Sequence, residues 1–183
     1  MIKLAYSVAA AVLLTACASS PGAMSTADTG MAADVAATAP TSAMGYVAAA
    51  GASDLFELQS SQVALQKARN PDVRAFAQMM LDEHTRTSGD LMAAARKAGL
   101  DPPPPALPAD KTAQLAALQS AGAAEFDAMY MRAQVAGHQE ALALHTGYAQ
   151  GGDQAALRAA AAKTAPIVRS HLERAETLAT AVG

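Results

Sequence analysis

Residues 70–99 read NPDVRAFAQMMLDEHTRTSGDLMAAARKAG, and this stretch decides the fold class. It opens with Asn70, Pro71 and Asp72, which supply a helix cap, a proline at the first helical position and an acidic first turn. Gly99 is a typical helix stop. Between these signals, positions suited to burial recur at alternating steps of four and three, as in a helix bundle: Val73, Ala77, Met80, His84, Thr87, Leu91, Ala94 and Ala98. The stretch therefore predicts a helix from Pro71 to Ala98.

The same periodicity predicts three more long helices on either side of this one. They run from Ala43 to Arg69, from Ala123 to Ala149 and from Gln154 to Thr180. A Gly-Gly-Asp turn at residues 151–153 precedes the last of them. Pro166 lies inside that last helix and removes one backbone hydrogen bond, so we expect a kink or a local break there.

The connection between the second and third long helices is long and has structure of its own. A proline-rich segment covers residues 101–108, and a short helix is predicted from Asp110 to Ser120. Together these segments span about 41 Å, which matches the height of a helix of about 27 residues. The third long helix can therefore run parallel to the second. The sequence thus predicts an all-α, ferritin-like four-helix bundle with a long crossover, whereas an up-down-up-down bundle needs only a short loop.

Composition supports an all-helical chain and excludes one class of partner. The 183 residues are 52% hydrophobic but only 4% aromatic, so the core must be packed from small side chains, which suits helices better than strands. This length predicts one domain after a leader and a linker are set aside. The formal net charge is −3, with scattered Lys and Arg, so we predict no nucleic-acid partner.

The N-terminal residues predict export and a membrane anchor. Lys3 precedes an apolar run from Leu4 to Leu14, which is too short to span a hydrocarbon core that needs about 20 residues. The run ends in Leu-Thr-Ala-Cys, which resembles the bacterial lipobox. We therefore predict a signal peptide over residues 1–16 and a lipid-modified Cys17, which makes the membrane a partner. The alternative is an ordinary secretory leader with an incidental cysteine.

Residues 18–43 are predicted to be a disordered tether that joins the anchor to a folded domain at 44–183. The segment consists mainly of Ala, Ser, Thr, Gly, Met and Pro, without sustained apolar periodicity. Met24, Met31 and Met44 offer thioethers of the kind that binds Cu(I), but we interpret them as composition.

The predicted anchor also indicates where in the cell the protein is located. The Ala-Ser that follows Cys17, with no aspartate there, resembles enterobacterial lipoproteins of the outer membrane. The predicted location is the periplasmic side of the cell envelope, at the outer membrane.

Several short motifs, taken in order, resemble a known bacterial family. They are Glu57 in Phe-Glu-Leu, the segments 76–80 and 82–85, Phe126-Asp127 with Tyr130, His138, and Pro166 before His171-Leu172. This set resembles domain-of-unknown-function family 4142, and the resemblance covers about Gly45 to Leu178. It implies a ferritin-like, exported envelope protein, and it implies no settled activity.

One polar cluster is predicted inside the bundle. Residue counts from the turns place Glu57, His84 and His138 near one height, with His171 about a turn higher. Imidazole and carboxylate suit iron, zinc, copper or manganese, so these four side chains form a candidate metal site. A di-iron ferroxidase is not expected, because its Glu-x-x-His pattern is replaced by Leu81 before His84 and by a valine before His171.

Three interpretations of this cluster remain open from the sequence. The one we favour is a buried hydrogen-bonded layer in which Glu57 pairs with histidines, followed by a metal site and then by proton-transfer catalysis. The predicted function is accordingly a lipid-anchored envelope protein of unassigned activity, with a role in metal binding or stress. The alternatives are a metal-dependent enzyme with redox or hydrolytic chemistry and a protein-interaction module of the envelope.

Other polar residues receive structural interpretations. Asp82 and Glu83 are expected to face solvent, because they point away from His84 around the helix. Asp127 and Tyr130 are expected to pair by a hydrogen bond. His145 is expected near a helix end, where it interacts with the helix dipole.

Overall fold

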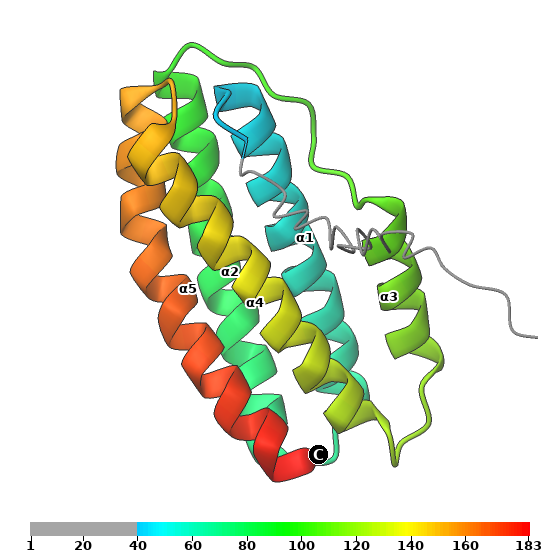
Figure 1. Ribbon diagram of the computed structural model, residues 1–183. Coiled ribbons are helices and arrows are strands. Elements are labelled where there is room, and N and C mark those ends of the chain that lie inside the picture. The colour runs from blue at the N-terminus through cyan, green and yellow to red at the C-terminus, as the bar shows by residue number, and fades with distance from the viewer. Residues whose placement is uncertain (1–39) are drawn as a thin grey trace, which may run out of the picture. The chain divides into compact units, whose positions relative to one another are not determined.

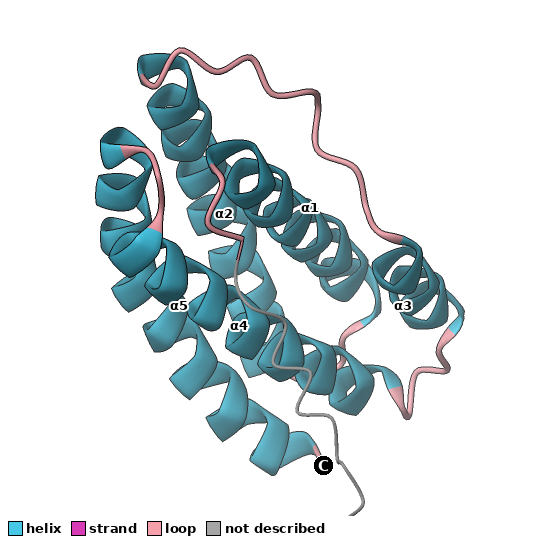
Figure 2. Ribbon diagram, turned by 45° about the horizontal axis from the view of Figure 1, so that its top comes forward, coloured by secondary structure: helices cyan, strands magenta, loops and turns pink. Residues whose placement is uncertain are grey.

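The computed structural model describes residues 40–183, and this part of the chain is helical without strands (Figure 2). Its five helices are α1 (Ala43–Lys67), α2 (Pro71–Lys97), α3 (Ala109–Ser120), α4 (Phe126–Gly151) and α5 (Ala155–Val182). The all-α prediction is confirmed. The predicted signal peptide, Cys17 and nearly all of the predicted tether lie outside the described residues.

The four long helices form a bundle in which every packed pair is antiparallel. The packed pairs are α1 with α2, α2 with α5, α5 with α4, and α4 with α1. Figure 1 shows that α1 and α5 run in one direction and that α2 and α4 run in the other. The short α3 packs outside this bundle against α1 and α4. The chain returns through α3 to the end at which α2 began, so the predicted long crossover is confirmed (Figure 1).

The ends of α2 show why the sequence predicts it well. The Asn70 side chain accepts hydrogen bonds from the backbone N–H of Asp72 at 2.8 Å and of Val73 at 3.3 Å. At the other end, Gly99 has a φ of +74°, a left-handed conformation that costs glycine little. Local chemistry therefore fixes both ends, and the predicted bounds differ from the observed ones by one residue.

Two expectations about helix bounds need correction. The first turn predicted for α4 is absent: the helix begins at Phe126 rather than Ala123, after a turn in which the Phe126 N–H bonds the Gly122 carbonyl. Pro166 does not break α5, which is continuous from Ala155 to Val182. The missing N–H costs one bond, and the buried face around His171 keeps the helix in place against its neighbours.

The predicted hydrogen bond between Asp127 and Tyr130 is wrong. The Asp127 carboxylate instead accepts from the backbone N–H of Asn70 at 2.8 Å and of Arg69 at 3.2 Å, in the turn between α1 and α2. The Tyr130 hydroxyl bonds the Ser61 hydroxyl at 2.9 Å. Tyr130 therefore ties α4 to α1, and Asp127 ties α4 to the turn between α1 and α2.

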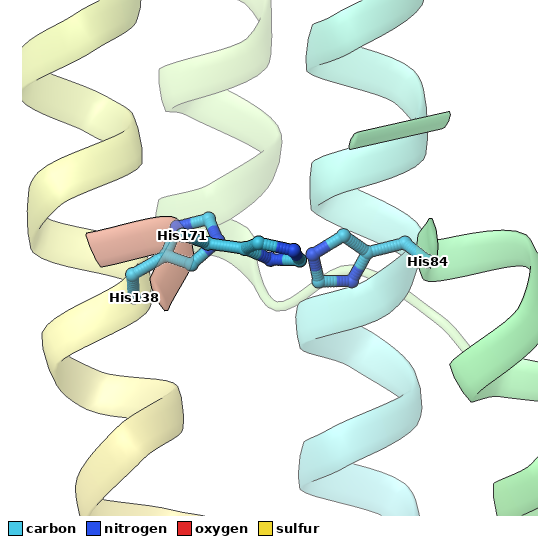
Figure 3. A group of neighbouring side chains, drawn as sticks. All are labelled: His84, His138 and His171. Atoms are coloured by element: carbon cyan, nitrogen blue, oxygen red, sulfur yellow. The ribbon is translucent and has the colours of Figure 1, made fainter. Parts of the chain in front are cut away.

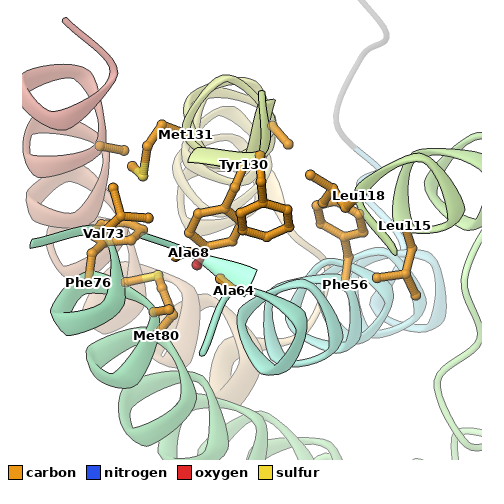
Figure 4. Close-up of a cluster of buried hydrophobic side chains, with 14 residues drawn as sticks. Phe56, Ala64, Ala68, Val73, Phe76, Met80, Leu115, Leu118, Tyr130 and Met131 are labelled. Carbon is orange, nitrogen blue, oxygen red and sulfur yellow. The ribbon is translucent and has the colours of Figure 1, made fainter. Parts of the chain in front are cut away.

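Two apolar clusters fill the bundle, one toward each end. The first contains Phe56, Phe76, Met80, Tyr130 and Met131, all at most 1% exposed (Figure 4). The second contains residues near the start of α1, the end of α2, the end of α4 and the start of α5: Tyr46, Val47, Leu91, Tyr148 and Leu157. Buried polar side chains occupy the middle of the helices, between these clusters. Within residues 40–183, no helix combines the length and hydropathy needed to cross a bilayer.

Candidate metal centre

Three imidazoles from three different helices meet in the middle of the bundle. His84 lies on α2, His138 on α4 and His171 on α5, and their side chains point toward one another (Figure 3). Each offers one ring nitrogen, and the three nitrogens lie within 4.8 Å of one another. The residues are only 4%, 1% and 3% exposed, respectively. The bundle therefore brings together three of the four residues of the candidate metal site, including His171, which residue counts placed about a turn higher.

His84 is held by a carboxylate on the neighbouring helix. Its Nδ1 lies 2.8 Å from Oδ1 of Asp54, and Oδ2 of Asp54 accepts from the Ser88 hydroxyl at 2.7 Å. A carboxylate only accepts hydrogen bonds, so the proton sits on Nδ1 of His84. This arrangement fixes the ring orientation and leaves Nε2 directed elsewhere.

The other two histidines are held in the same way. Nδ1 of His138 donates to the backbone carbonyl of Gln134 at 2.8 Å, and Nε2 of His171 donates to Oε2 of Glu83 at 3.0 Å. Each acceptor is an oxygen that cannot donate, so each bonded nitrogen carries the proton. The remaining nitrogen of each neutral ring then carries a lone pair.

The second nitrogen of each ring has no partner. Nε2 of His84, Nε2 of His138 and Nδ1 of His171 are buried and make no hydrogen bond. Leaving a buried polar group unpaired costs about 1–3 kcal/mol, and native proteins rarely do so without a reason. A hydrogen-bonded structural layer would satisfy these atoms. Three neighbouring imidazoles that each keep one nitrogen without a hydrogen-bond partner instead suit a cation.

Burial sets the protonation of the centre. It lowers the pKa of His138 to about 4 and that of His171 to about 4, so both rings are neutral near pH 7. Burial also opposes the charged form of His84. The hydrogen bond and negative charge of Asp54 outweigh it, and the pKa of His84 is raised. Two of the three rings are therefore ready to donate a lone pair at neutral pH.

Glu57 lies in the same layer but outside the group of three imidazoles. Its Oε1 is 3.8 Å from Nδ1 of His138, the nitrogen that already donates to the Gln134 carbonyl. Glu57 therefore faces the bonded side of that ring, and its predicted pairing with a histidine is not a hydrogen bond. Burial raises the pKa of Glu57 to about 7. Its carboxylate fits because position 137 is glycine, where a Cβ would come within 2.8 Å of Oε1.

The sequence matches a family model described as Domain of unknown function (DUF4142) over residues 26–178. The protein belongs to the DUF4142 family. The resemblance inferred from short motifs is thereby confirmed. No curated protein matches this DUF4142 chain.

Solved structures share the fold of this DUF4142 domain. A DUF305 fragment from Deinococcus radiodurans is 15% identical, with a TM-score of 0.66, and the match covers 75% of this chain and 95% of that one. CopM in the Cu(II)-bound form is 13% identical, with a TM-score of 0.63 and coverage of 76% and 96%. CopM in the Ag-bound form is 15% identical, with a TM-score of 0.61 and coverage of 74% and 93%. At these identities the similarity establishes the fold.

Sequence reasoning missed the two carboxylates that hold the histidines of the DUF4142 centre. Asp54 is only 8% exposed, and its one signal in the sequence is that it precedes Glu57 by three residues on the same helix face. Glu83 was expected to face solvent, and the structure corrects this expectation. Its side chain is 36% exposed, but Oε2 reaches His171 because α5 packs beside it.

His145 needs a similar correction. It is 6% exposed and joins the second apolar cluster, where its Nδ1 lies 2.9 Å from the Tyr46 hydroxyl. Tyr46 also stacks on Tyr148 with ring centroids 4.0 Å apart. His145 is therefore a buried core residue of the DUF4142 domain, and it contacts α1 rather than the end of its own helix.

Proposed function

We propose that this DUF4142 protein is a lipid-anchored protein of the cell envelope that binds one transition-metal ion between His84, His138 and His171. The observation that carries the proposal is that three buried imidazoles each offer a ring nitrogen within 4.8 Å of the others and that each ring keeps one nitrogen without a hydrogen-bond partner. The groups that accept hydrogen bonds from the three rings also support the proposal. Histidines that ligate a metal usually donate their other N–H to a carboxylate or a backbone carbonyl, and each of these three does so.

The donor set indicates which metals fit. Imidazole suits zinc, copper, iron and nickel, and copper binds most tightly among the divalent ions of the first row. The copper- and silver-bound forms of CopM share this fold, which supports copper as the first choice. Manganese prefers carboxylate and carbonyl oxygen, and Glu57 stands outside the group, so manganese fits least.

The spacing of the nitrogens is compatible with an ion after a small movement. Ligands about 2.0–2.1 Å from a tetrahedral zinc ion lie about 3.3 Å apart. The three nitrogens are within 4.8 Å of one another, so side-chain adjustments of about an ångström would close the site. Three protein ligands leave one coordination position free. Because each ring is at most 4% exposed, the centre suits an ion better than an external substrate, which favours binding over catalysis.

The proposed location in the cell envelope rests on the N-terminal sequence. A leader that ends in Leu-Thr-Ala-Cys at Cys17 supports lipid attachment, and the residues after it support the periplasmic face of the outer membrane. A bundle on such an anchor would meet metal ions in the periplasm before they reach the cytoplasm. We propose that it sequesters or carries them there.

Metal analysis tests the proposal directly. The purified protein is stripped with a chelator, dialysed against Cu(II) or Zn(II), freed of unbound ion and analysed by elemental mass spectrometry. We expect about one equivalent of metal per chain, held by the three imidazoles. Metal content that stays far below one equivalent after reconstitution would rule out the proposed function.

Asp54→Asn tests the role of the carboxylate behind His84. The amide can still accept the Nδ1–H, but it lacks the charge that makes the imidazole a stronger donor. We therefore expect metal affinity to fall by about 10–100-fold in a competition titration against a chromogenic chelator. Asp90→Asn, at an exposed aspartate on α2, the helix that carries His84, is the matched control and should bind as the wild type does. Equal affinity in both variants would contradict a metal-supporting role for Asp54.

A further inference from the structure

Met80 lies on the buried face of α2, one helical turn before His84. The ring of His138 lies 6.4 Å from that of Phe76 and 5.7 Å from that of His84, measured between centroids. Phe76 and His84 are each four residues from Met80, so the three share one helix face at successive turns. Met80 is 0% exposed and points into the bundle (Figure 4). Along α2, Met80 therefore lies midway between the two residues whose rings are within 6.4 Å of that of His138.

A thioether at this position changes the chemistry of the centre. Three imidazoles alone suit borderline ions, whereas a methionine sulfur selects the soft monovalent ions Cu(I) and Ag(I). Histidine sites with an additional weak methionine ligand are established for copper. Methionine is also the most adaptable apolar side chain, because it is unbranched and has three rotatable bonds. It can approach an ion without movement of the helix.

We propose that Met80 is the fourth protein ligand of the centre and adapts it to monovalent soft ions, Cu(I) and its analogue Ag(I). This inference rests on the proposed function of His84, His138 and His171. A leucine would fill nearly the same apolar volume in an ordinary bundle core. Met80 is the methionine one turn from His84 on the same buried face, which is what coordination at this centre requires.

Met131 provides the matched control. It is also 0% exposed and belongs to the same apolar cluster as Met80. On α4, however, it lies seven residues before His138, which is about 10 Å along the helix axis. Replacement of either methionine by leucine nearly conserves volume and is among the best tolerated core substitutions. Both variants therefore test ligation with little risk to folding.

The experiment compares a soft monovalent ion with a borderline divalent ion. The wild type, Met80→Leu and Met131→Leu are titrated with Ag(I) and with Zn(II) in competition with a chelator, and helix content is checked by circular dichroism. We expect Met80→Leu to weaken Ag(I) binding by tenfold or more and to change Zn(II) binding by less than about threefold. Met131→Leu should change neither.

The possible outcomes separate this inference from the function it rests on. Equal Ag(I) affinity in the wild type and Met80→Leu overturns the role of Met80 but leaves the three-histidine site intact. Equal losses for Ag(I) and Zn(II) also overturn it, because Met80 would then act through packing alone. A wild type that binds neither ion refutes the proposed function itself.

Discussion

Replacement of His138 by alanine is expected to abolish metal binding, the largest single effect that the structure predicts. His138 supplies one of the three unpartnered nitrogens, and its removal leaves two imidazoles. At a metal concentration of about 100 times Kd, binding stabilises the folded state by about 2.7 kcal/mol. For a chain of this size, that corresponds to a Tm increase of roughly 5–10 °C. The variant should lose this increase, and its bound metal should fall below about a tenth of an equivalent.

Calorimetry with and without metal checks this result, and the comparison is internal to each variant. It therefore does not depend on how much the loss of the ring destabilises the metal-free protein. Gln139→Ala, at an exposed neighbouring position, is the control and should keep the full metal-dependent increase. If His138→Ala folds poorly, His138→Gln retains more volume and serves in its place. A metal-dependent Tm increase that survives both substitutions at His138 would refute the three-histidine site.

His145 is expected to make the protein markedly less stable in acid. Burial lowers its pKa to about 4, and the negative charge of Asp54 opposes this only in part. The unfolded chain, with a histidine pKa near 6.5, then binds a proton that the folded chain refuses. The contribution to stability is full above about pH 6.5 and is lost as the pH falls toward 4. The loss amounts to about 3 kcal/mol over that window.

Urea unfolding of His145→Gln at pH 7.5 and at pH 4.5, without metal, measures this contribution. Glutamine keeps a polar group near the Tyr46 hydroxyl but takes up no proton. The wild type should therefore lose about 2–3 kcal/mol more than the variant between the two pH values. The other histidines titrate in both proteins, so their contributions cancel in the difference. The same loss in both proteins would show that His145 is not buried as a neutral ring.

The sequence allowed the helices to be predicted because the signals that form them are local. Asn70 and Gly99 fixed α2 to within a residue, and the alternating spacing placed His84 on its buried face. Bounds that depend on turns were predicted less well. The start of α4 was placed three residues early, because the turn from Gly122 to Phe126 is held by backbone bonds from the Glu125 and Phe126 N–H to the Gly122 carbonyl, which composition does not reveal.

The candidate site was predicted in part for a related reason. Periodicity identifies which side chains face inward, so His84, His138 and His171 were found as buried positions. Residue counts along rigid helices brought His84 and His138 to one height but placed His171 about a turn too high. Glu57 was also correctly placed at the height of the histidines, but the sequence did not predict which side of the His138 ring its carboxylate faces. Which nitrogen of His138 it faces depends on rotamers that only the packed neighbours select.

Taken alone, the sequence determined an all-helical bundle, its crossover, the family and the buried positions of the three histidines. These features follow from cap residues, from a periodicity of 3.6 and from chain length, all of which act over short distances along the chain. Only the tertiary structure decided that Asp54 and Glu83 hold two of the rings and that three nitrogens remain unpartnered. Hydrogen bonds between helices depend on the relative rotation and height of packed surfaces, and no single helix carries that information.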